Sequence, residues 1–221
     1  MARAVSESSV LDRLEAFGVV PVIVIENVAS AASLGPALVA GGLPCAEVTL
    51  RTDAALESLR ILAEDPNVLV GAGTVIRPQQ VEVALDAGAR FIVSPGFSSE
   101  VVGECRRAGV PVLPGVATAT EVQAALEAGV DVVKFFPAES MGGVGGLRAL
   151  AAPFRSVRFV PTGGIVATSL PSYLAVPSVL AVGGSWIVPA ELLAAGDFPR
   201  ITALAAAAVE VVRDVRVGVA P

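Results

Sequence analysis

The chain has 221 residues, of which 54% are hydrophobic and 16% charged, and its net charge is −6 at pH 7. This acidic balance argues against nucleic acid as a partner, because a basic stripe is the usual footprint of nucleic-acid binding. The low charge also indicates that part of the surface is buried against other subunits. Length and the absence of linkers predict one domain over residues 1–221.

The first predicted element, residues 1–18, is a polar amphipathic helix and not a secretory signal. After it, a helix ending in Ala-Gly and followed by a hydrophobic run recurs, as in βα units around a parallel sheet. Strands are predicted near residues 19–25, 45–50, 68–73, 91–95, 110–115, 130–136, 158–162 and 178–183. Eight parallel strands close a barrel. We therefore expect an α/β fold, a single (β/α)8 TIM barrel over residues 19–198, with the extra N-terminal helix and a C-terminal helix over 199–216.

One long uncharged stretch runs from Phe159 to Ala190. It contains four prolines and two Gly-Gly pairs, which a continuous apolar helix would not tolerate. We expect two buried strands with a short helix between them, and no membrane partner.

Metal and disulfide chemistry find little support in the sequence. There is no histidine, and the two cysteines, Cys45 and Cys105, form neither a CxxC motif nor a disulfide framework. Cys45 begins a predicted strand and is expected to be a small core residue. We predict no metal, no cofactor and a reducing, cytoplasmic location.

Function in such a barrel is expected at the carboxyl ends of the strands. The residues at these ends are Glu47 and Arg51, Gly73 and Thr74, Ser94 and Pro95, Lys134 and Phe136, Thr162 with Gly163 and Gly164, and Gly183 with Gly184 and Ser185. Because side chains alternate along a strand, Glu47 and Arg51 share one face, as Lys134 and Phe136 do. We predict that Glu47, Arg51 and Lys134 point together into the barrel mouth.

Lys134 is the only lysine among 15 basic residues, and it lies within an apolar run. Arginine cannot replace lysine as an amine nucleophile, because its guanidinium stays protonated. Attack on a carbonyl needs the unprotonated amine, which apolar surroundings favour. Lys134 is therefore a candidate Schiff-base lysine. The structural alternative is a lysine that is merely paired with a buried carboxylate such as Asp131.

Imine formation also needs a group that transfers protons. In the absence of histidine a carboxyl must do this, and Glu47 is the inward candidate; the alternative is a buried ion pair of Glu47 with Lys134. Arg51 could bind a carboxylate in bidentate fashion, with the Thr74 hydroxyl as a further donor. A salt bridge of Arg51 to Asp53 or Glu47 explains its presence almost as well.

The two Gly-Gly segments, at 163–164 and 183–184, follow the seventh and eighth predicted strands. In barrels of this type, that is the usual phosphate site, built from backbone N–H groups. A third glycine-rich segment, Gly142–Gly146, lacks the Lys-Ser/Thr of a P-loop and is expected to be a mobile loop over the site.

Several segments together resemble one family: PVIVIENV, AEVTLRT, VGAGTV, FIVSPG, VKFFPAE, AAPFRSVRFVPTGGI and VGGSWIVPAELLAAGD. They are similar to 2-keto-3-deoxy-6-phosphogluconate (KDPG) aldolases, a family that includes 4-hydroxy-2-oxoglutarate aldolases. The resemblance covers about residues 19–201. It implies a metal-free class I aldolase, a carbon–carbon lyase that is usually a cytoplasmic homotrimer of the Entner–Doudoroff pathway of carbohydrate metabolism. Only the loop GGVGGL differs from the usual pattern, in which a lysine or other polar residue follows GGV.

The resemblance also implies roles for individual residues. Lys134 would be the Schiff-base lysine and Glu47 the general acid/base. The pyruvyl end of the substrate would be lined by Arg51, Thr74, Pro95, Phe136 and Thr162. The phosphate would be held by Gly163, Gly164, Gly184 and Ser185.

The implied reaction is reversible cleavage of KDPG, a phosphorylated keto acid, to pyruvate and glyceraldehyde 3-phosphate. One alternative is the same chemistry acting mainly on 4-hydroxy-2-oxoglutarate or on 2-keto-3-deoxy-6-phosphogalactonate. Another is a phosphosugar epimerase or isomerase on the same barrel, which would need no imine. A barrel that binds a phosphate ligand without catalysis is a third.

Overall fold

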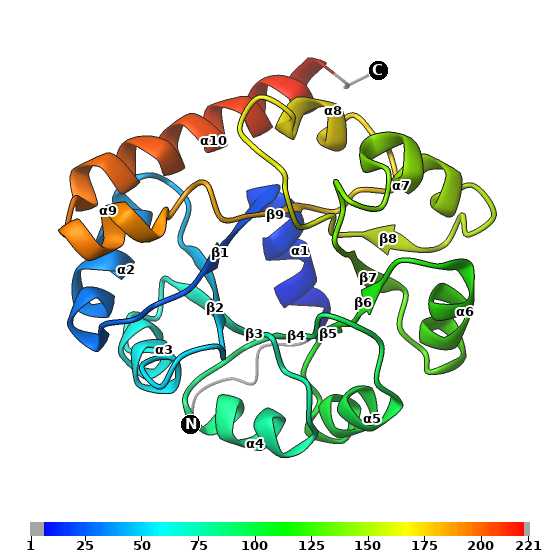
Figure 1. The fold of residues 1–221 in the computed structure, drawn as a ribbon, viewed down its shortest axis with the longest axis horizontal. Helices are drawn as coiled ribbons and strands as arrows, with labels where there is room; N and C mark the ends of the chain where they lie inside the picture. Colours follow the sequence, from blue (N-terminus) through cyan, green and yellow to red (C-terminus); the bar gives the residue numbers. More distant parts are fainter. Residues whose placement is uncertain (1–6, 219–221) are drawn as a thin grey trace.

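The computed structural model describes residues 7–218, in which parallel strands form a ring enclosed by helices (Figure 1). The strands are β1 (Val19–Ile23), β2 (Cys45–Thr49), β3 (Leu69–Gly73), β4 (Ile92–Val93), β5 (Val112–Leu113), β6 (Gly115–Val116), β7 (Val132–Phe135), β8 (Arg158–Phe159) and β9 (Val182–Gly184). The helices are α1 (Glu7–Phe17), the short 3-10 helix η1 (Val28–Ser30), α2 (Ala31–Ala40), α3 (Ala55–Ala63), α4 (Gln79–Asp86), α5 (Ser99–Ala108), α6 (Ala119–Glu127), α7 (Gly143–Ala151), α8 (Leu170–Leu174), α9 (Ala190–Ala195) and α10 (Phe198–Gly218).

Each of the predicted strand regions overlaps a strand, and the region 110–115 overlaps two, β5 and β6. The uncharged stretch holds α8 between β8 and β9, as predicted. Helix α1 lies within the predicted N-terminal helix, whose residues 1–6 are outside the described part of the chain. The predicted C-terminal helix lies within α10.

The strands form two parallel sheets, which differs from the single closed sheet of eight strands that we expected. One sheet has six strands in the order β5-β4-β3-β2-β1-β9, and the other has three in the order β6-β7-β8. Isolated parallel bridges join Phe159 to Val179 and Thr162 to Gly183. Prolines account for part of the interruption, because Pro114 separates β5 from β6 and Pro161 follows β8, and neither has an N–H for a sheet hydrogen bond.

Helix ends follow the Ala-Gly signal seen in the sequence. The α5 helix begins at Ser98, whose side chain accepts a hydrogen bond from the Val101 N–H, and ends at Gly109 in the left-handed conformation. Helix α6 begins with a capping box between Thr118 and Glu121. These ends fix where each following strand starts.

Apolar side chains separate into two cores. The larger lies between strands and outer helices and includes Val48, Val133 and Phe135. The smaller fills the inside of the ring at the amino-terminal ends of the strands; its members are Val10, Leu14, Val20, Cys45, Leu69, Phe91, Val93, Leu113, Val132, Val160, Leu180 and Ala181. Because Val10 and Leu14 come from α1, this helix covers the amino-terminal end of the ring, where Figure 1 shows it across the centre.

Within residues 7–218, no helix has both the length and the apolar character that a membrane span requires. The long α10 instead packs its buried residues against the fold, and α2 and α8 are among its neighbours.

Candidate active site

Lys134 and Glu47 meet inside the ring. The Lys134 Nζ donates a hydrogen bond to the Glu47 Oε1 at 3.0 Å. Lys134 is 6% exposed and Glu47 3%, so the pair is almost entirely removed from water without being fully sealed. Glu47 comes from the six-stranded sheet and Lys134 from the three-stranded one, and the pair therefore links the two. Of the structural alternatives, a pairing of Lys134 with Asp131 is wrong, because Asp131 is exposed, whereas a buried ion pair of Lys134 with Glu47 is what the structure contains.

Strand alternation explains why these two side chains point inward. On β2, Cys45 belongs to the inner core, whereas Val48 belongs to the outer one. On β7, Val132 is in the inner core and Val133 in the outer one. The predicted faces of both strands are thus confirmed. Burial raises the pKa of the Cys45 thiol, which keeps it protonated as a small core residue.

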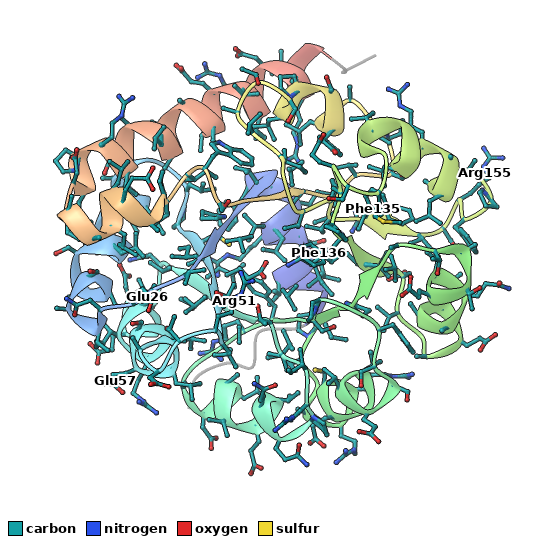
Figure 2. All side chains as sticks on the ribbon, in the orientation of Figure 1. Glu26, Arg51, Glu57, Phe135, Phe136 and Arg155 are labelled. Atoms are coloured by element: carbon teal, nitrogen blue, oxygen red, sulfur yellow. The ribbon has the colours of Figure 1, made fainter. Side chains whose placement is uncertain are left out.

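Phe136 and Pro95 lie close to Lys134. The Lys134 Nζ is 5.3 Å from the centre of the Phe136 ring, a distance at which a cation is attracted to the ring face. Figure 2 shows Phe136 nearer the centre of the ring than Phe135. Gly115 is the β-sheet partner of Lys134, and a Cβ on Gly115 would lie only 2.1 Å from the Pro95 carbonyl oxygen. The missing side chain of Gly115 lets the backbone of Pro95 approach β6, the strand that pairs with β7 at Lys134.

Gly73 makes room for the Glu47 carboxyl. A Cβ added at Gly73 would lie 2.3 Å from the Glu47 Oε1, which is closer than real contacts allow. The next residue, Thr74, has a φ of 59°, a left-handed conformation that is rare for a threonine. Such strain persists where the surroundings enforce it, often at functional sites.

The variant Gly73→Ala is expected to fold and to lose activity, with a kcat lower by about 10²-fold, because a displacement of roughly 1 Å at a catalytic group has that effect. Gly73 lies in β3 and does not have a positive φ, so the alanine tests space rather than backbone strain. Steady-state kinetics would measure the effect.

Gly103→Ala is the matched control, because a Cβ there meets no other atom within 4 Å and alanine favours helix α5. Its activity should equal that of the unmodified protein. Normal turnover in Gly73→Ala would show that Glu47 does not need its present position.

Arg51 lies just beyond the end of β2, and it is exposed. Figure 2 shows it inside the ring of helices. The turn that carries it is tied to β1, since the hydroxyls of Thr49 and Thr52 donate to the carbonyls of Ile23 and Ile25. A salt bridge to Asp53 or Glu47 does not occur: within residues 7–218 Arg51 forms no ion pair.

The two Gly-Gly segments lie next to each other. Thr162 is buried and forms a bridge with Gly183, where a Cβ would lie 2.2 Å from the Thr162 Oγ1. Gly163 and Gly164 have φ values of 104° and 78°, which favour glycine. Gly184 packs against the Trp186 ring, and Ser185 is exposed. In both loops the space that a side chain would need is thus taken by other residues of the chain, which accounts for the glycines.

The third glycine-rich segment corrects one expectation. Gly143 to Gly146 form the first turn of helix α7 and are not a loop. Gly142, at the N-cap of this helix, adopts the left-handed conformation. A Cβ at Gly146 would lie 2.1 Å from the Met141 carbonyl oxygen. Low helix propensity suggested a loop, but close packing of the chain onto this turn requires glycine.

The packing roles of some residues were missed from the sequence, although Gly73 itself was named at the end of a predicted strand. Gly73 had a usable signal, since glycine within a strand often marks a close approach of another group. Gly115 had the same signal. The contact of Glu139 with Tyr173, described below, had none, because it joins residues far apart in the chain. Within residues 7–218 there is no group of three or more His, Cys, Asp or Glu side chains that could hold a metal ion.

A buried lysine amine against a carboxylate within parallel βα units is the arrangement expected of enzymes that work through a lysine nucleophile. More particularly, the chain belongs to the KDPG and KHG aldolase family, whose model matches residues 10–204. It is therefore an aldolase, a carbon–carbon lyase.

Individual relatives agree with this. The 2-dehydro-3-deoxy-phosphogluconate aldolase of Treponema pallidum is 49% identical over 205 residues, covering 92% of this chain and 98% of the relative. A crystal structure of the KDPG aldolase of Zymomonas mobilis with 3-phosphoglycerate has a TM-score of 0.85 at 48% identity, covering 90% of this chain and 94% of that one. The KDPG aldolase of Legionella pneumophila, with pyruvate captured at low pH as a covalent carbinolamine, has a TM-score of 0.87 at 42% identity, with coverage of 92% and 98%.

Proposed function

We propose that this protein is a class I aldolase that reversibly cleaves KDPG to pyruvate and glyceraldehyde 3-phosphate through an imine on Lys134. The observation that carries the proposal is the buried 3.0 Å contact of the only lysine with Glu47. The family membership supports it, as does the carbinolamine of pyruvate captured in the Legionella relative.

The first stage joins the substrate to Lys134. The amine adds to the C2 ketone, forming a C–N bond, and the ketone oxygen takes up a proton. Glu47, in hydrogen-bond contact with the amine, transfers protons so that the C2 hydroxyl leaves as water and an iminium forms.

The second stage breaks the carbon–carbon bond. Glu47, or a water that it positions, removes the proton of the C4 hydroxyl. The C3–C4 bonding electrons move into the iminium to give an enamine, and the aldehyde, glyceraldehyde 3-phosphate, leaves. Protonation of the enamine at C3 and hydrolysis of the iminium release pyruvate and restore Lys134.

Substrate contacts follow from the placement of the remaining residues. The pyruvyl end would be bound near Lys134, where its carboxylate would meet the unpaired Arg51. Its other neighbours would be Thr74, Pro95, Phe136 and Thr162. The phosphate would lie on the adjoining glycine loops, at Gly163, Gly164, Gly184 and Ser185. The solved Zymomonas relative with 3-phosphoglycerate supports a phosphorylated ligand.

Three broader features belong to the same proposal. The two parallel sheets would act as one (β/α)8 barrel in a single domain over residues 1–221, with isolated bridges from Phe159 of β8 to Val179 and from Thr162 to Gly183 of β9. The enzyme would be a homotrimer in the cytoplasm, acting in the Entner–Doudoroff pathway. Low surface charge and family likeness support the oligomer.

A second candidate is the same reaction on 4-hydroxy-2-oxoglutarate, which the name of the family model includes. The galactonate epimer of KDPG is a variant of the first candidate. Comparing kcat/KM for KDPG and 4-hydroxy-2-oxoglutarate separates them, because paired phosphate loops favour only the phosphorylated acid.

Trapping tests the imine directly. Incubation with pyruvate and sodium borohydride should give one reduced pyruvyl adduct per chain, on Lys134, with loss of activity. Peptide mass spectrometry locates it. An intact mass without the adduct would contradict the imine on Lys134 that the proposal requires.

A further inference from the structure

Glu139 and Tyr173 form a hydrogen-bonded pair behind the first Gly-Gly loop. The Tyr173 hydroxyl donates to the Glu139 Oε1 at 2.6 Å, a length typical of a hydroxyl bound to a carboxylate. Tyr173, the only tyrosine of the chain, is fully buried on α8. Burial and the bond to Glu139 raise the pKa of Tyr173, so the phenol remains a donor.

Glu139 also contacts the other end of the segment that carries Tyr173. Its backbone N–H donates to the Gly163 carbonyl at 3.0 Å. A Cβ on Gly164 would lie 2.8 Å from the Glu139 Cβ, so the two residues are packed directly against each other. Glu139 thus holds the segment from Gly163 to Tyr173 at both ends, once through its backbone and once through its carboxylate.

We propose that Glu139, through Tyr173, is a positioning residue that keeps the Gly163–Gly164 loop in the shape that binds the substrate phosphate. This rests on the proposed function, which assigns the phosphate to that loop. Neither side chain reaches the reacting carbons. The pair acts by fixing the loop before the ligand arrives, which reduces the ordering that binding must impose.

The geometry also explains how the Glu139 carboxylate can lie near the bound phosphate without strong repulsion. A free carboxylate beside the glycine loop would repel the anion. The Tyr173 hydroxyl holds the Glu139 side chain toward α8, and near the start of α7, where a Cβ on Gly143 would lie 3.6 Å from both groups. The hydrogen bond therefore orders the loop and directs the negative charge away from it.

The test uses the full-length enzyme and compares a phosphorylated with an unphosphorylated ligand. In Tyr173→Phe, which keeps the ring and removes the donor, KM for KDPG should rise about fivefold to tenfold, as for the loss of one hydrogen bond. The value of kcat should change less than about twofold, and the rate of pyruvate trapping by borohydride should be unchanged, because pyruvate lacks the phosphate.

Two further variants separate positioning from bulk stability. Glu139→Ala should also raise KM for KDPG, but less than Tyr173→Phe, because it removes the contact together with the carboxylate that would repel the phosphate; the double variant should match Glu139→Ala, since no contact remains to be lost. Glu139→Gln keeps an acceptor for the phenol and should stay near the unmodified KM. Thermal unfolding of each variant shows that kinetics are measured on folded protein.

An unchanged KM for KDPG in Tyr173→Phe and Glu139→Ala would overturn the proposal. So would an equal loss of pyruvate trapping, which would make the pair a support of the whole site, or a lower kcat at constant KM. Failure of the proposed function is distinct from these outcomes, because then the unmodified enzyme would neither trap pyruvate nor cleave KDPG.

Discussion

Replacing the single lysine should abolish catalysis while leaving the fold intact. In Lys134→Arg we expect kcat/KM for KDPG cleavage to fall by at least about 10⁴-fold, since loss of a covalent nucleophile has effects of that order or larger. A guanidinium can still donate to Glu47, so the buried carboxylate keeps a partner. It cannot form the imine, because it stays protonated and delocalised.

The chain offers a sharp control, because it has no other lysine. The variant Arg60→Lys adds an amine on the exposed face of α3, and it should remain fully active with one borohydride adduct at position 134. Combining it with Lys134→Arg restores one lysine at the wrong place, and this enzyme should be inactive and give no adduct. Circular dichroism and thermal unfolding would establish folding. Measurable aldol cleavage by folded Lys134→Arg would refute the assignment of the nucleophile.

The second large effect is expected from Glu47→Gln. The amide keeps the size of the carboxyl and can accept the hydrogen bond from Lys134, but it cannot carry a proton between steps. Loss of a general acid/base lowers rates by roughly 10²- to 10⁴-fold. Slower pyruvate trapping should accompany the lower kcat, since dehydration to the iminium uses the same group. Rapid-quench measurement with borohydride gives both rates.

Glu57→Gln is the matched control, since Glu57 is exposed on α3 and pairs with Arg60. Such surface pairs contribute little, so both activity and stability should be close to normal. If Glu47→Gln trapped pyruvate and cleaved KDPG at the normal rates, Glu47 would be only a structural partner of Lys134.

The inward placement of Glu47 and Lys134 could be predicted because strand alternation is a local property. Residues 45–49 and 132–135 are short, apolar on one face and bounded by glycine or proline signals, and the structure places their faces as expected. Lys134 stood out for a compositional reason, as the only residue of its type. Neither inference needed knowledge of contacts between distant segments.

What could not be predicted depends on such distant contacts. Whether Arg51 would pair within the chain was undecided from sequence, because two carboxylates, Asp53 and Glu47, both lie close to it along the chain. The division into two sheets depends on hydrogen bonds that Pro114 and Pro161 cannot make. The glycines at 143–146 suggested a loop because helix propensity ignores the packing that Gly146 permits. The Glu139–Tyr173 pair needed three-dimensional structure altogether.

The position of helix α1 affects how substrate enters and products leave the active site. Within residues 7–218, this helix covers the amino-terminal ends of the strands and packs there on an apolar layer rich in valine and leucine, so exchange with solvent is expected at the opposite end. In the proposed orientation, the phosphorylated half of the substrate would lie at this open end, and the pyruvyl half would stay attached to Lys134 deeper inside. The departing aldehyde thus shields the enamine from stray protons until it leaves, and in the synthetic direction an incoming aldehyde can intercept the carbon nucleophile before water quenches it.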